Sequence, residues 1–364
     1  MSKSLGNGID PLEVVRTFGA DAMRFTLVNA AALGTDLQLD HEDLDSSFRV
    51  GRNFANKMWN AVRFGLGYLE EEDFSTRPSD TELELADRWI LARFSETAQA
   101  VTDALERFRL HDASELAYQF VWGEFCDWYL ELVKQRLRGD RGEASRAAAA
   151  ATFASVLDGW LRLLHPIMPF ITEEVYCHLP GRTEEDSLIH GPWPGPEAVP
   201  DARIALEAFE AVQEIVGAVR NLRSDYGVDP SRTVEVIVAR APAVVAEALG
   251  SEQEGVLRLG RISKLDLADA LPVGQPGAHA VLRSGAEVFL PLSGVVDLDR
   301  ERERIAGEIE RLNGLLAGSR ARLADHRFTD RAPPDVVEKE RDKCRSLEER
   351  LELLVEKREA YGAG

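Results

Sequence analysis

The sequence predicts a mainly α-helical protein: a helical bundle, a small α+β module and a C-terminal antiparallel coiled-coil hairpin. Three observations support this prediction. Apolar residues recur every three or four positions through most of residues 48–195, which is typical of amphipathic helices. Runs rich in β-branched residues, such as 234–238, gather between 201 and 296. Two charged stretches in 297–364 each carry one apolar seam, which is typical of paired helices.

The first segment, residues 1–47, begins with a polar loop and continues into short helices. Residues 1–7 read Met-Ser-Lys-Ser-Leu-Gly-Asn. The Asp-Pro-Leu-Glu sequence at 10–13 supplies a capping residue, a proline at the first helical position and a first-turn glutamate. A short helix is therefore expected there. A second helix is expected after Gly19, and a short polar helix near Glu42.

Residues 48–200 are expected to form the antiparallel bundle. Helices are predicted over 54–66, 83–108 and 111–138, because apolar side chains recur there on one face. An alanine-rich helix is expected after the loop at 139–142. Long helices joined by short loops favour an up-and-down arrangement.

Residues 201–296 are expected to form the α+β module. It begins with a helix over 202–225, on which Arg220 and Arg223 lie one turn apart. These two arginines either contact phosphate or lie on a solvated face. The other predicted elements are a helix over 242–257 and strands over 234–238, 262–267, 280–282 and 287–290.

Residues 297–364 are expected to form the hairpin, with arms over 297–323 and 334–361. Each arm of roughly 27 residues would reach about 40 Å at 1.5 Å per residue. The segment to 360 carries 15 Lys and Arg against 17 Asp and Glu, whereas the remainder carries 28 against 46. The hairpin is thus nearly neutral on an acidic chain and is better suited than the rest to approach RNA. A dimerisation coil is the alternative.

Composition narrows the class of protein. The length of 364 residues, with 45% hydrophobic and 29% charged residues, describes a globular chain of about two or three domains. No apolar run reaches the roughly 20 residues of a membrane span, so a cytoplasmic protein without a membrane partner is expected. The three cysteines are far apart and the histidines lack ligand spacing, so neither a disulfide framework nor a protein-bound metal is expected.

The formal net charge of −20 argues against binding nucleic acid through bulk electrostatics. Local basic or aromatic patches on an acidic body can still read the shape and the unstacked bases of structured RNA. The charge therefore does not exclude an RNA-binding protein.

Several motifs carry a resemblance to one enzyme family. Residues 1–7 resemble the Lys-Met-Ser-Lys-Ser-Leu-Gly-Asn signature loop of class I aminoacyl-tRNA synthetases, without its first lysine. The Gly-Ala-Asp-Ala-Met-Arg-Phe stretch at 19–25 looks like the segment that follows this loop in valyl-tRNA synthetases. Further stretches are similar to the anticodon-binding helices and the C-terminal arm of that family: 49–61, 124–131, 164–174, 289–299 and 328–341. The resemblance covers essentially the whole chain, in the order of the family's C-terminal portion.

The resemblance implies a function. The family activates valine with ATP, used together with Mg²⁺, and transfers it to tRNA(Val). This chain resembles the tRNA-binding part, and nothing in it resembles the nucleotide-binding fold, the amino-acid pocket or the editing domain. It is therefore expected to be inactive alone. A methionine start inside the signature loop is expected of a gene fragment, a mis-started frame or one half of a split enzyme.

The resemblance also implies site residues. Lys3 would be the catalytic lysine, which brings an ammonium group to the charge that builds as pyrophosphate leaves. Ser2 and Ser4 would join it in binding ATP as hydrogen-bond donors. The expected anticodon contacts, carried over by position in the matching helices, are Asn53, Lys57, Phe64 and Trp122. For each aromatic residue in these helices, packing in the core is the alternative to stacking on bases.

Two other functions stay open. The chain could be a free-standing tRNA-binding protein, or the half of a split enzyme that acts in trans. It could also belong to an isoleucine-type ligase, but the C-terminal zinc-binding cysteines usual there are missing and the hairpin arm is present. The expected partner is tRNA(Val), with valine and ATP bound through a catalytic domain, and the expected state is a monomer.

Overall fold

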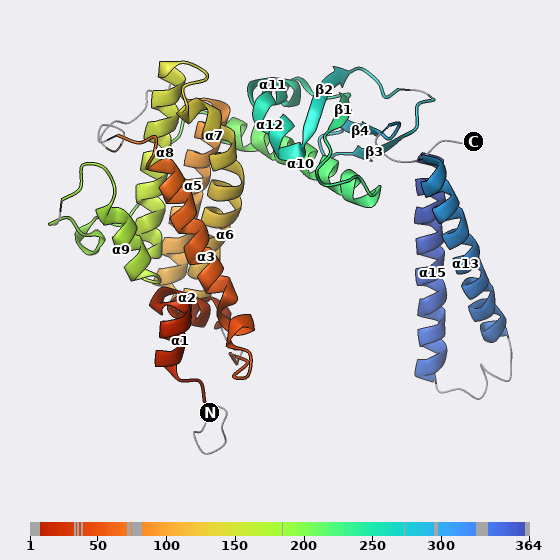
Figure 1. The fold of residues 1–364 in the computed structure, drawn as a ribbon, viewed down its shortest axis with the longest axis horizontal. Helices are drawn as coiled ribbons and strands as arrows, with labels where there is room; N and C mark the ends of the chain where they lie inside the picture. Colours follow the sequence, from red (N-terminus) through yellow and green to blue (C-terminus); the bar gives the residue numbers. More distant parts are fainter. Residues whose placement is uncertain are drawn as a thin grey trace. The chain divides into compact units, whose positions relative to one another are not determined.

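The computed structural model describes residues 8–32, 34, 36–37, 39–70, 74, 82–183, 185–272, 274–294, 298–324 and 334–360. The chain divides into two compact units, Met1–Phe209 and Glu210–Gly364. Helices dominate both units, and the strands of the described part form one small sheet in the second (Figure 1). The mainly α-helical fold is therefore confirmed. The division into four segments stays a prediction, because the two units do not separate those segments one by one.

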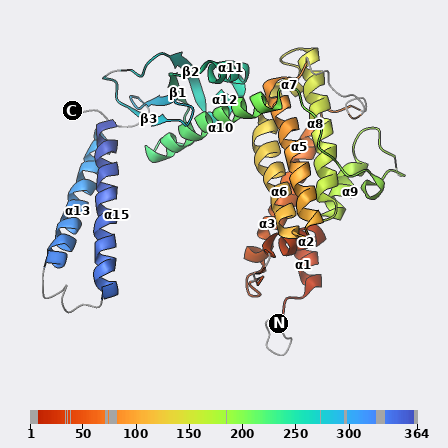
Figure 2. The ribbon, with the colours of Figure 1, turned by 180° about the vertical axis from the view of Figure 1, so that it is seen from behind.

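The first unit is a helical bundle with two short helices at one end. The long helices lie side by side from both directions of view, and α1 and α2 lie at the end where the described chain begins (Figures 1 and 2). Its helices are α1 (Pro11–Phe18), α2 (Ala20–Ala30), α3 (Leu44–Gly65), α5 (Leu85–Glu106), α6 (Leu110–Gln119), η2 (Phe120–Tyr129), α7 (Leu130–Leu137), α8 (Glu143–Leu164), α9 (Pro169–Cys177) and η3 (Leu188–His190).

Helix α1 begins where the sequence predicts it. The side chain of Asp10 accepts a hydrogen bond from the amide of Leu12 at 3.0 Å, and Pro11 takes the first helical position. Gly19 ends the helix with φ at +92°, a conformation that glycine adopts without the steric penalty of a side chain. This turn allows α2 to begin at the next residue.

Helix α3 differs from its prediction, because the polar helix expected near Glu42 and the amphipathic helix after it are one element of 22 residues. The carboxylate of Asp43 caps it by accepting from the amide of Ser46 at 3.0 Å. Gly51 then lies directly against α2: a Cβ there would come within 2.4 Å of the carbonyl oxygen of Ala22. A residue without a side chain is therefore required where α3 crosses α2.

The core of the bundle lies between α3, α5, η2 and α8. Helix α8 is long and apolar enough by composition to cross a membrane, but 78% of that apolar stretch is buried inside the structure, as in the core helix of a globular protein. The largest fully buried side chains of these four helices are Phe48, Phe54, Met58, Ile90, Phe120, Phe125, Tyr129, Phe153 and Trp160.

One buried ion pair joins four helices of the bundle. The carboxylate of Asp87, at the start of α5, is 0% exposed and lies 2.7 Å from the guanidinium of Arg136 on α7. The hydroxyl of Tyr129 in η2 donates to the same carboxylate at 3.0 Å. Arg136 also donates to the side-chain oxygen of Ser145 on α8 at 2.9 Å and lies 3.2 Å from the carboxylate of Glu84. The pair thus ties the start of α5 to η2, α7 and α8.

The charge of Arg136 is stabilised by these partners. Burial by itself lowers the pKa of a guanidinium. Here the charge of Asp87 and its hydrogen bond outweigh burial and raise the pKa of Arg136 above its ordinary value. The arginine therefore stays protonated inside the bundle, where an unpaired charge would be costly.

The predicted helix over 111–138 is wrong in its middle. The ends of this run, α6 and α7, are α-helical, but η2 is a π-helix of ten residues. A π-helix closes its hydrogen bonds over i→i+5 rather than i→i+4 and is rare beyond a single turn. The apolar positions 120, 125 and 129 fit this wider turn and are all buried, so core packing is satisfied without an α-helical repeat.

The second unit contains a mixed four-stranded sheet in the order β2-β1-β4-β3; its strands are labelled in Figure 1. Strand β1 pairs in parallel with β2 and antiparallel with β4, which pairs antiparallel with β3. The helix predicted over 242–257 is interrupted at Glu252. The elements are α10 (Ala202–Asp225), whose first residues belong to the first unit, β1 (Val234–Ala239), α11 (Ala243–Ser251), α12 (Gln253–Gly260), β2 (Ile262–Ala268), β3 (Gly277–Val281) and β4 (Glu287–Pro291).

Arg220 and Arg223 bind the backbone of this unit. Arg220 donates twice to the carbonyl oxygen of Leu259, at 2.9 and 3.1 Å. Arg223 is 7% exposed and donates to the carbonyl oxygens of Arg261 and Asp229 at 3.3 and 3.2 Å. A solvated face is therefore wrong for Arg223, and both guanidinium groups serve to hold loops in place.

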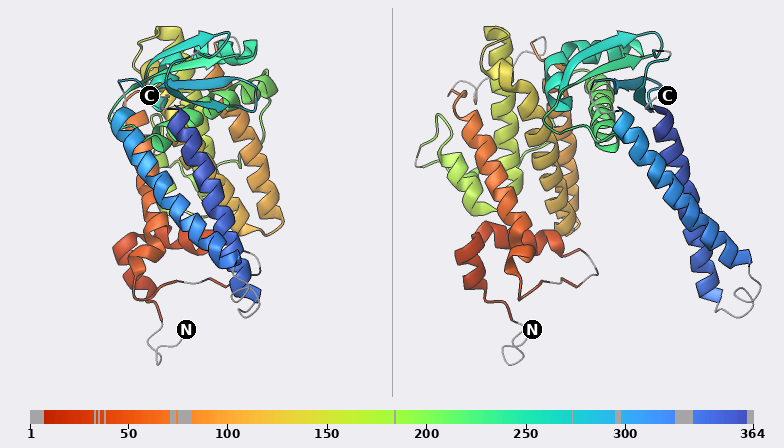
Figure 3. Two further views of the ribbon diagram at one scale, coloured as in Figure 1. Left: turned by 90° about the vertical axis from the view of Figure 1, so that its right-hand side faces the viewer. Right: turned by 45° about the vertical axis from the view of Figure 1, so that its right-hand side comes forward.

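The second unit also contains the predicted hairpin, formed by α13 (Leu298–Ala324) and α15 (Pro334–Ala360). The two helices run antiparallel and side by side (Figure 3). Ion pairs join them across the seam: Arg320 with Glu348 at 2.6 Å, Arg350 with Glu308 at 2.6 Å and Arg322 with Glu340 at 3.5 Å. The seam buries Ile305, Leu312, Leu316, Ser319, Val337 and Cys344, of which the sequence pattern missed Ser319 and Cys344.

The buried ion pair yields a prediction of stability. We expect Asp87→Ala to lower the free energy of unfolding of the bundle by about 3–5 kcal/mol, because it removes the buried, closest carboxylate from the charge of Arg136 and leaves only the partly exposed Glu84. Urea unfolding followed by far-UV circular dichroism measures this. The matched control is Glu207→Ala, whose pair with Arg203 is 61% and 83% exposed and is expected to contribute about 1 kcal/mol or less. Equal effects of the two substitutions would show that the buried pair does not hold the bundle together.

Candidate nucleic-acid interface

The predicted ATP-site residues Ser2, Lys3 and Ser4 lie outside the described residues. Their roles therefore stay predictions. The structure describes the chain from residue 8, just before α1. For this part of the site it therefore shows how α1 and α2 are held in the bundle.

Polar contacts hold α2 against the turn before α9 and against the first turn of α9. Arg24 donates to the carbonyl oxygens of Pro166 and Ile167 at 2.9 and 3.0 Å. The carboxylate of Asp21 accepts from the amides of Phe170 and Ile171 at 3.3 and 2.5 Å. Burial raises the pKa of Asp21, while these two amides act in the opposite direction. The segment that follows the signature loop is thus held by side chains from the Gly-Ala-Asp-Ala-Met-Arg-Phe stretch.

Three of the four predicted anticodon residues lie on α3. Asn53, Lys57 and Phe64 are four and then seven residues apart, a spacing that places them on one face of a helix. Asn53 is exposed, and Lys57 and Phe64 are half-buried. The fourth residue, Trp122, lies in η2, which packs against α3.

The structure brings Lys57 and Trp122 together. The ammonium nitrogen of Lys57 lies 4.8 Å from the centre of the Trp122 ring, a cation–π contact. The same nitrogen donates to the carboxylate of Asp127 at 2.5 Å. Tyr118 packs beside Trp122 with 5.7 Å between ring centres. We call Lys57, Trp122 and Asp127 the Lys57 cluster.

Phe64 belongs to a second group further along α3. The ammonium of Lys134 on α7 lies 5.4 Å from the centre of its ring, and the ring of Tyr68 lies 5.1 Å away. The ring of Phe64 is thus flanked by a cation and an aromatic side chain. The family resemblance identified Phe64 but not its two neighbours.

Sequence reasoning missed Asp127 as a residue of this surface. It lies within a stretch that carried the family resemblance, yet nothing in its spacing indicated a contact with a lysine 70 positions earlier. Trp59, two residues after Lys57, lies on another face of α3, because residues two apart in a helix do not face the same side. Of Trp59, 40% is exposed, and its ring meets His178 edge-on at 6.5 Å.

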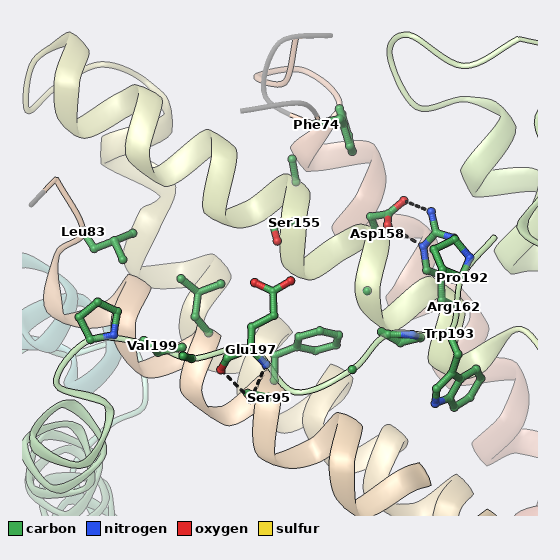
Figure 4. A pocket seen from close by; sticks show the side chains of 18 of the residues that line it. Phe74, Leu83, Ser95, Ser155, Asp158, Arg162, Pro192, Trp193, Glu197 and Val199 are labelled. Carbon is green, nitrogen blue, oxygen red and sulfur yellow. Dashed lines mark hydrogen bonds and ion pairs between the residues drawn. The ribbon is translucent and has the colours of Figure 1, made fainter. Parts of the chain in front are cut away.

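A cavity of about 540 Å³ lies elsewhere in the first unit, between α5, α8 and the chain at 192–200 (Figure 4). At one side the carboxylate of Asp158 lies 2.7 Å from Arg162 and 3.2 Å from Arg182, and Glu197 adds a second carboxylate to the lining. The side chains of Leu83 and Val199 line its other part (Figure 4). The cavity therefore combines apolar walls with two guanidinium groups and two carboxylates.

The extended chain over this cavity is attached to α5. The hydroxyl of Ser95 donates to the carbonyl oxygen of Glu197 and accepts from its amide, both at 3.0 Å. The indole nitrogen of Trp193 donates to the hydroxyl of Thr102 at 2.8 Å. The two anchors on α5 are seven residues apart and so lie on one face. Ser95 is thus occupied by backbone and not arranged as a nucleophile with a base.

The described residues hold no group of three or more His, Cys, Asp or Glu side chains placed to bind a metal ion. Cys126 lies beside the Lys57 cluster, but burial raises the pKa of its thiol to about 12. It is therefore protonated at neutral pH and a poor nucleophile. The described surface around α3 and η2 presents cations, an amide and aromatic rings.

Family models match three parts of the chain in order. Residues 1–40 match "tRNA synthetases class I (I, L, M and V)". Residues 87–238 match "Anticodon-binding domain of tRNA ligase", a range that includes Trp122 but begins after the three candidate residues on α3. Residues 297–360 match "Valyl tRNA synthetase tRNA binding arm", which coincides with the hairpin of α13 and α15.

Curated relatives match nearly the whole chain. The valine–tRNA ligase of Clostridium acetobutylicum is 38% identical over 98% of this chain and 40% of its own length. Those of Geobacter sulfurreducens and Syntrophotalea carbinolica are 39% and 37% identical over 98% and 97% of this chain. A solved ternary complex of Agrobacterium radiobacter K84 agnB2 LeuRS with tRNA and LeuAMS matches at 24% identity and a TM-score of 0.40, over 54% of this chain and 22% of that one. That score is too low to support a relationship by itself.

The assignment therefore rests on sequence. The chain spans about two fifths of the length of the curated relatives that it matches. The last of the three matched models is specific to valyl-tRNA synthetases and covers the C-terminal hairpin. In sequence, this chain is thus a relative of the valine–tRNA ligases and corresponds to a C-terminal portion of them.

Proposed function

We propose that this chain is the C-terminal, tRNA-binding part of a valine–tRNA ligase, the enzyme that joins valine to tRNA(Val) at the expense of ATP. The observation that supports this best is the order of three matches in one chain: a class I synthetase segment, an anticodon-binding domain and a tRNA-binding arm. The chain acts in the cytoplasm as a monomer. It binds tRNA(Val) directly, and valine and ATP through a catalytic domain.

Each of the four sequence segments has a role in this proposal. Residues 1–47 supply the ATP-site loop and the contact with the tRNA stem. Residues 48–200 bind the anticodon, and residues 297–364 bind the outer corner of the tRNA. Residues 201–296 are the small module between them.

The bundle surface has the chemistry needed to recognise an anticodon. Sequence-specific RNA recognition mostly uses unstacked bases, which are read by aromatic side chains and by hydrogen bonds to their edges. Asn53 supplies an exposed amide, Lys57 a cation, and Phe64 and Trp122 aromatic rings. An acidic chain can use such a surface because it depends on a few placed groups rather than on net charge.

The ATP-site loop contributes one step of the chemistry. Lys3 stabilises the negative charge that develops as pyrophosphate leaves ATP, and Ser2 and Ser4 donate hydrogen bonds to the nucleotide. ATP brings Mg²⁺ to the complete enzyme. Because one loop cannot form a pocket for ATP and valine, these 364 residues produced alone should not activate valine.

The first test concerns this activity. We expect the isolated chain to show no valine-dependent ATP–pyrophosphate exchange. In a longer enzyme built around it, Lys3→Ala should lower kcat for activation more than it changes KM for valine, because the lysine acts on charge in the transition state. An unchanged kcat with a raised KM would remove Lys3 from this role. Robust exchange by the isolated chain would contradict the assignment of these residues as the tRNA-binding part alone.

The second test concerns the arm. Deleting residues 297–364 should weaken binding to full-length tRNA(Val) and make the remaining binding less sensitive to salt, because phosphate contacts release counterions. Circular dichroism should show that the bundle remains folded, since the seam of the hairpin closes on itself. Undiminished tRNA binding would contradict an RNA-binding arm, and so would a dimer that becomes monomeric on truncation.

A point substitution keeps the arm folded in a second version of this test. Arg345 pairs only within α15 among the described contacts, with Asp342 at 3.4 Å, and 66% of its side chain is exposed. Arg345→Gln should therefore weaken tRNA binding without opening the seam. Arg203→Gln, on the exposed start of α10, is the matched control.

A further inference from the structure

The Lys57 cluster contains a lysine that is held at two points. Its ammonium nitrogen donates to Asp127 at 2.5 Å and lies 4.8 Å from the centre of the Trp122 ring. The side chains of Lys57 and Asp127 remain 32% and 46% exposed. A free surface lysine samples many rotamers, and fixing it normally costs conformational entropy. Here the folded protein has already restricted the side chain while leaving its charge accessible.

The π-helix accounts for this arrangement. Trp122 and Asp127 are five residues apart, and in an α-helix with 3.6 residues per turn such residues point about 140° away from each other. The i→i+5 turn of η2 is wider and brings the two positions back to one side. Both side chains can therefore reach the same ammonium group on α3. π-Helical turns are rare, and single-turn π-bulges are frequently found at functional sites.

The contact between Lys57 and Trp122 also determines which groups of this surface are available to bind RNA. The ammonium lies over the ring of Trp122, and Tyr118 packs beside the same ring. A base that stacked on the covered face would first have to displace the lysine. An ammonium group has three N–H donors, and Asp127 takes one of them. The exposed group that remains is a cation with free donors, whose natural partner in RNA is a phosphate oxygen.

We propose that Asp127 and Trp122 are positioning residues, which hold Lys57 as a pre-oriented donor to a backbone phosphate of a bound RNA. This rests on the proposed tRNA-binding function and refines it. Lys57 touches the RNA, and Asp127 and Trp122 act through Lys57. The expected anticodon contact of Trp122 thereby becomes an indirect one.

The proposal and general electrostatics predict opposite changes in RNA affinity when Asp127 is made neutral. A carboxylate near a polyanion repels it, so its replacement by a neutral amide should leave RNA binding equal or tighten it. If Asp127 positions Lys57, the same replacement weakens binding, because the lysine then loses its orientation. Asp45 provides a matched control on α3: its carboxylate lies 2.7 Å from Arg52 and is 53% exposed, so Asp45→Asn makes the same change of charge without touching Lys57.

The experiment measures the Kd of the full chain for a tRNA(Val) transcript at several salt concentrations. We expect Asp127→Asn to raise Kd about three- to tenfold, which corresponds to a loss of up to about 1.4 kcal/mol. The slope of log Kd against log salt concentration should fall by about one, which corresponds to the loss of one phosphate contact. Asp127→Glu should restore most of the affinity, and Asp45→Asn should leave Kd equal or lower. Thermal unfolding of each variant checks that the fold is unchanged.

Double-mutant cycles separate positioning from direct contact. In a Lys57→Gln background, Asp127→Asn and Trp122→Leu should cause no further loss of affinity. Additive effects of Trp122→Leu would mean that the ring contacts RNA itself, and tighter binding by Asp127→Asn would mean that its carboxylate only repels RNA; either result overturns the proposal. If the unmodified chain does not bind the transcript, the proposed function fails instead, which is a distinguishable outcome.

Discussion

The buried ion pair between Asp87 and Arg136 is the interaction on which the arrangement of the bundle depends. It lies where α5, η2, α7 and α8 meet, and its carboxylate is fully removed from water. Tyr129 joins the pair from the end of η2, so the π-helix is fixed at the point where α7 begins. Because the Lys57 cluster is built between η2 and α3, the surface that we assign to RNA depends on a charge pair in the interior.

An acidic chain that binds RNA must place its cations rather than accumulate them. Several described cations of both proposed contact regions are already engaged: Lys57 with Asp127, Lys134 with the ring of Phe64, and Arg320 and Arg350 across the hairpin. Such pairing lowers the general attraction for polyanions and holds the positive groups in defined positions. Exposed pairs of this kind contribute little to stability, so their value here is geometric.

Sequence patterns predicted what depends on local repetition. The amphipathic stretches of α3 and α5, the strand at 234–238 and the hairpin seam follow from periods that burial imposes. The π-helix was missed because most apolar steps of this run, from 116 to 120 and from 125 to 128 and 132, follow α-helical spacing, and the step of five from 120 to 125 was not recognised as a wider turn. The Lys57 cluster and the carbonyl contacts of Arg223 were missed because their partners lie far along the chain. The family resemblance identified Lys57 and Trp122, but their contact with each other is a property of the fold.

The central claim is that tRNA contacts both the α3–η2 surface of the bundle and the hairpin. Hydroxyl-radical footprinting of the full chain with and without tRNA(Val) tests it most directly, since these radicals oxidise exposed aromatic and aliphatic side chains. The account predicts protection of Phe64 on the bundle and of exposed residues on the hairpin, such as Leu315, which is 45% exposed. Unchanged oxidation at both surfaces, with protection confined to the sheet module, would contradict it.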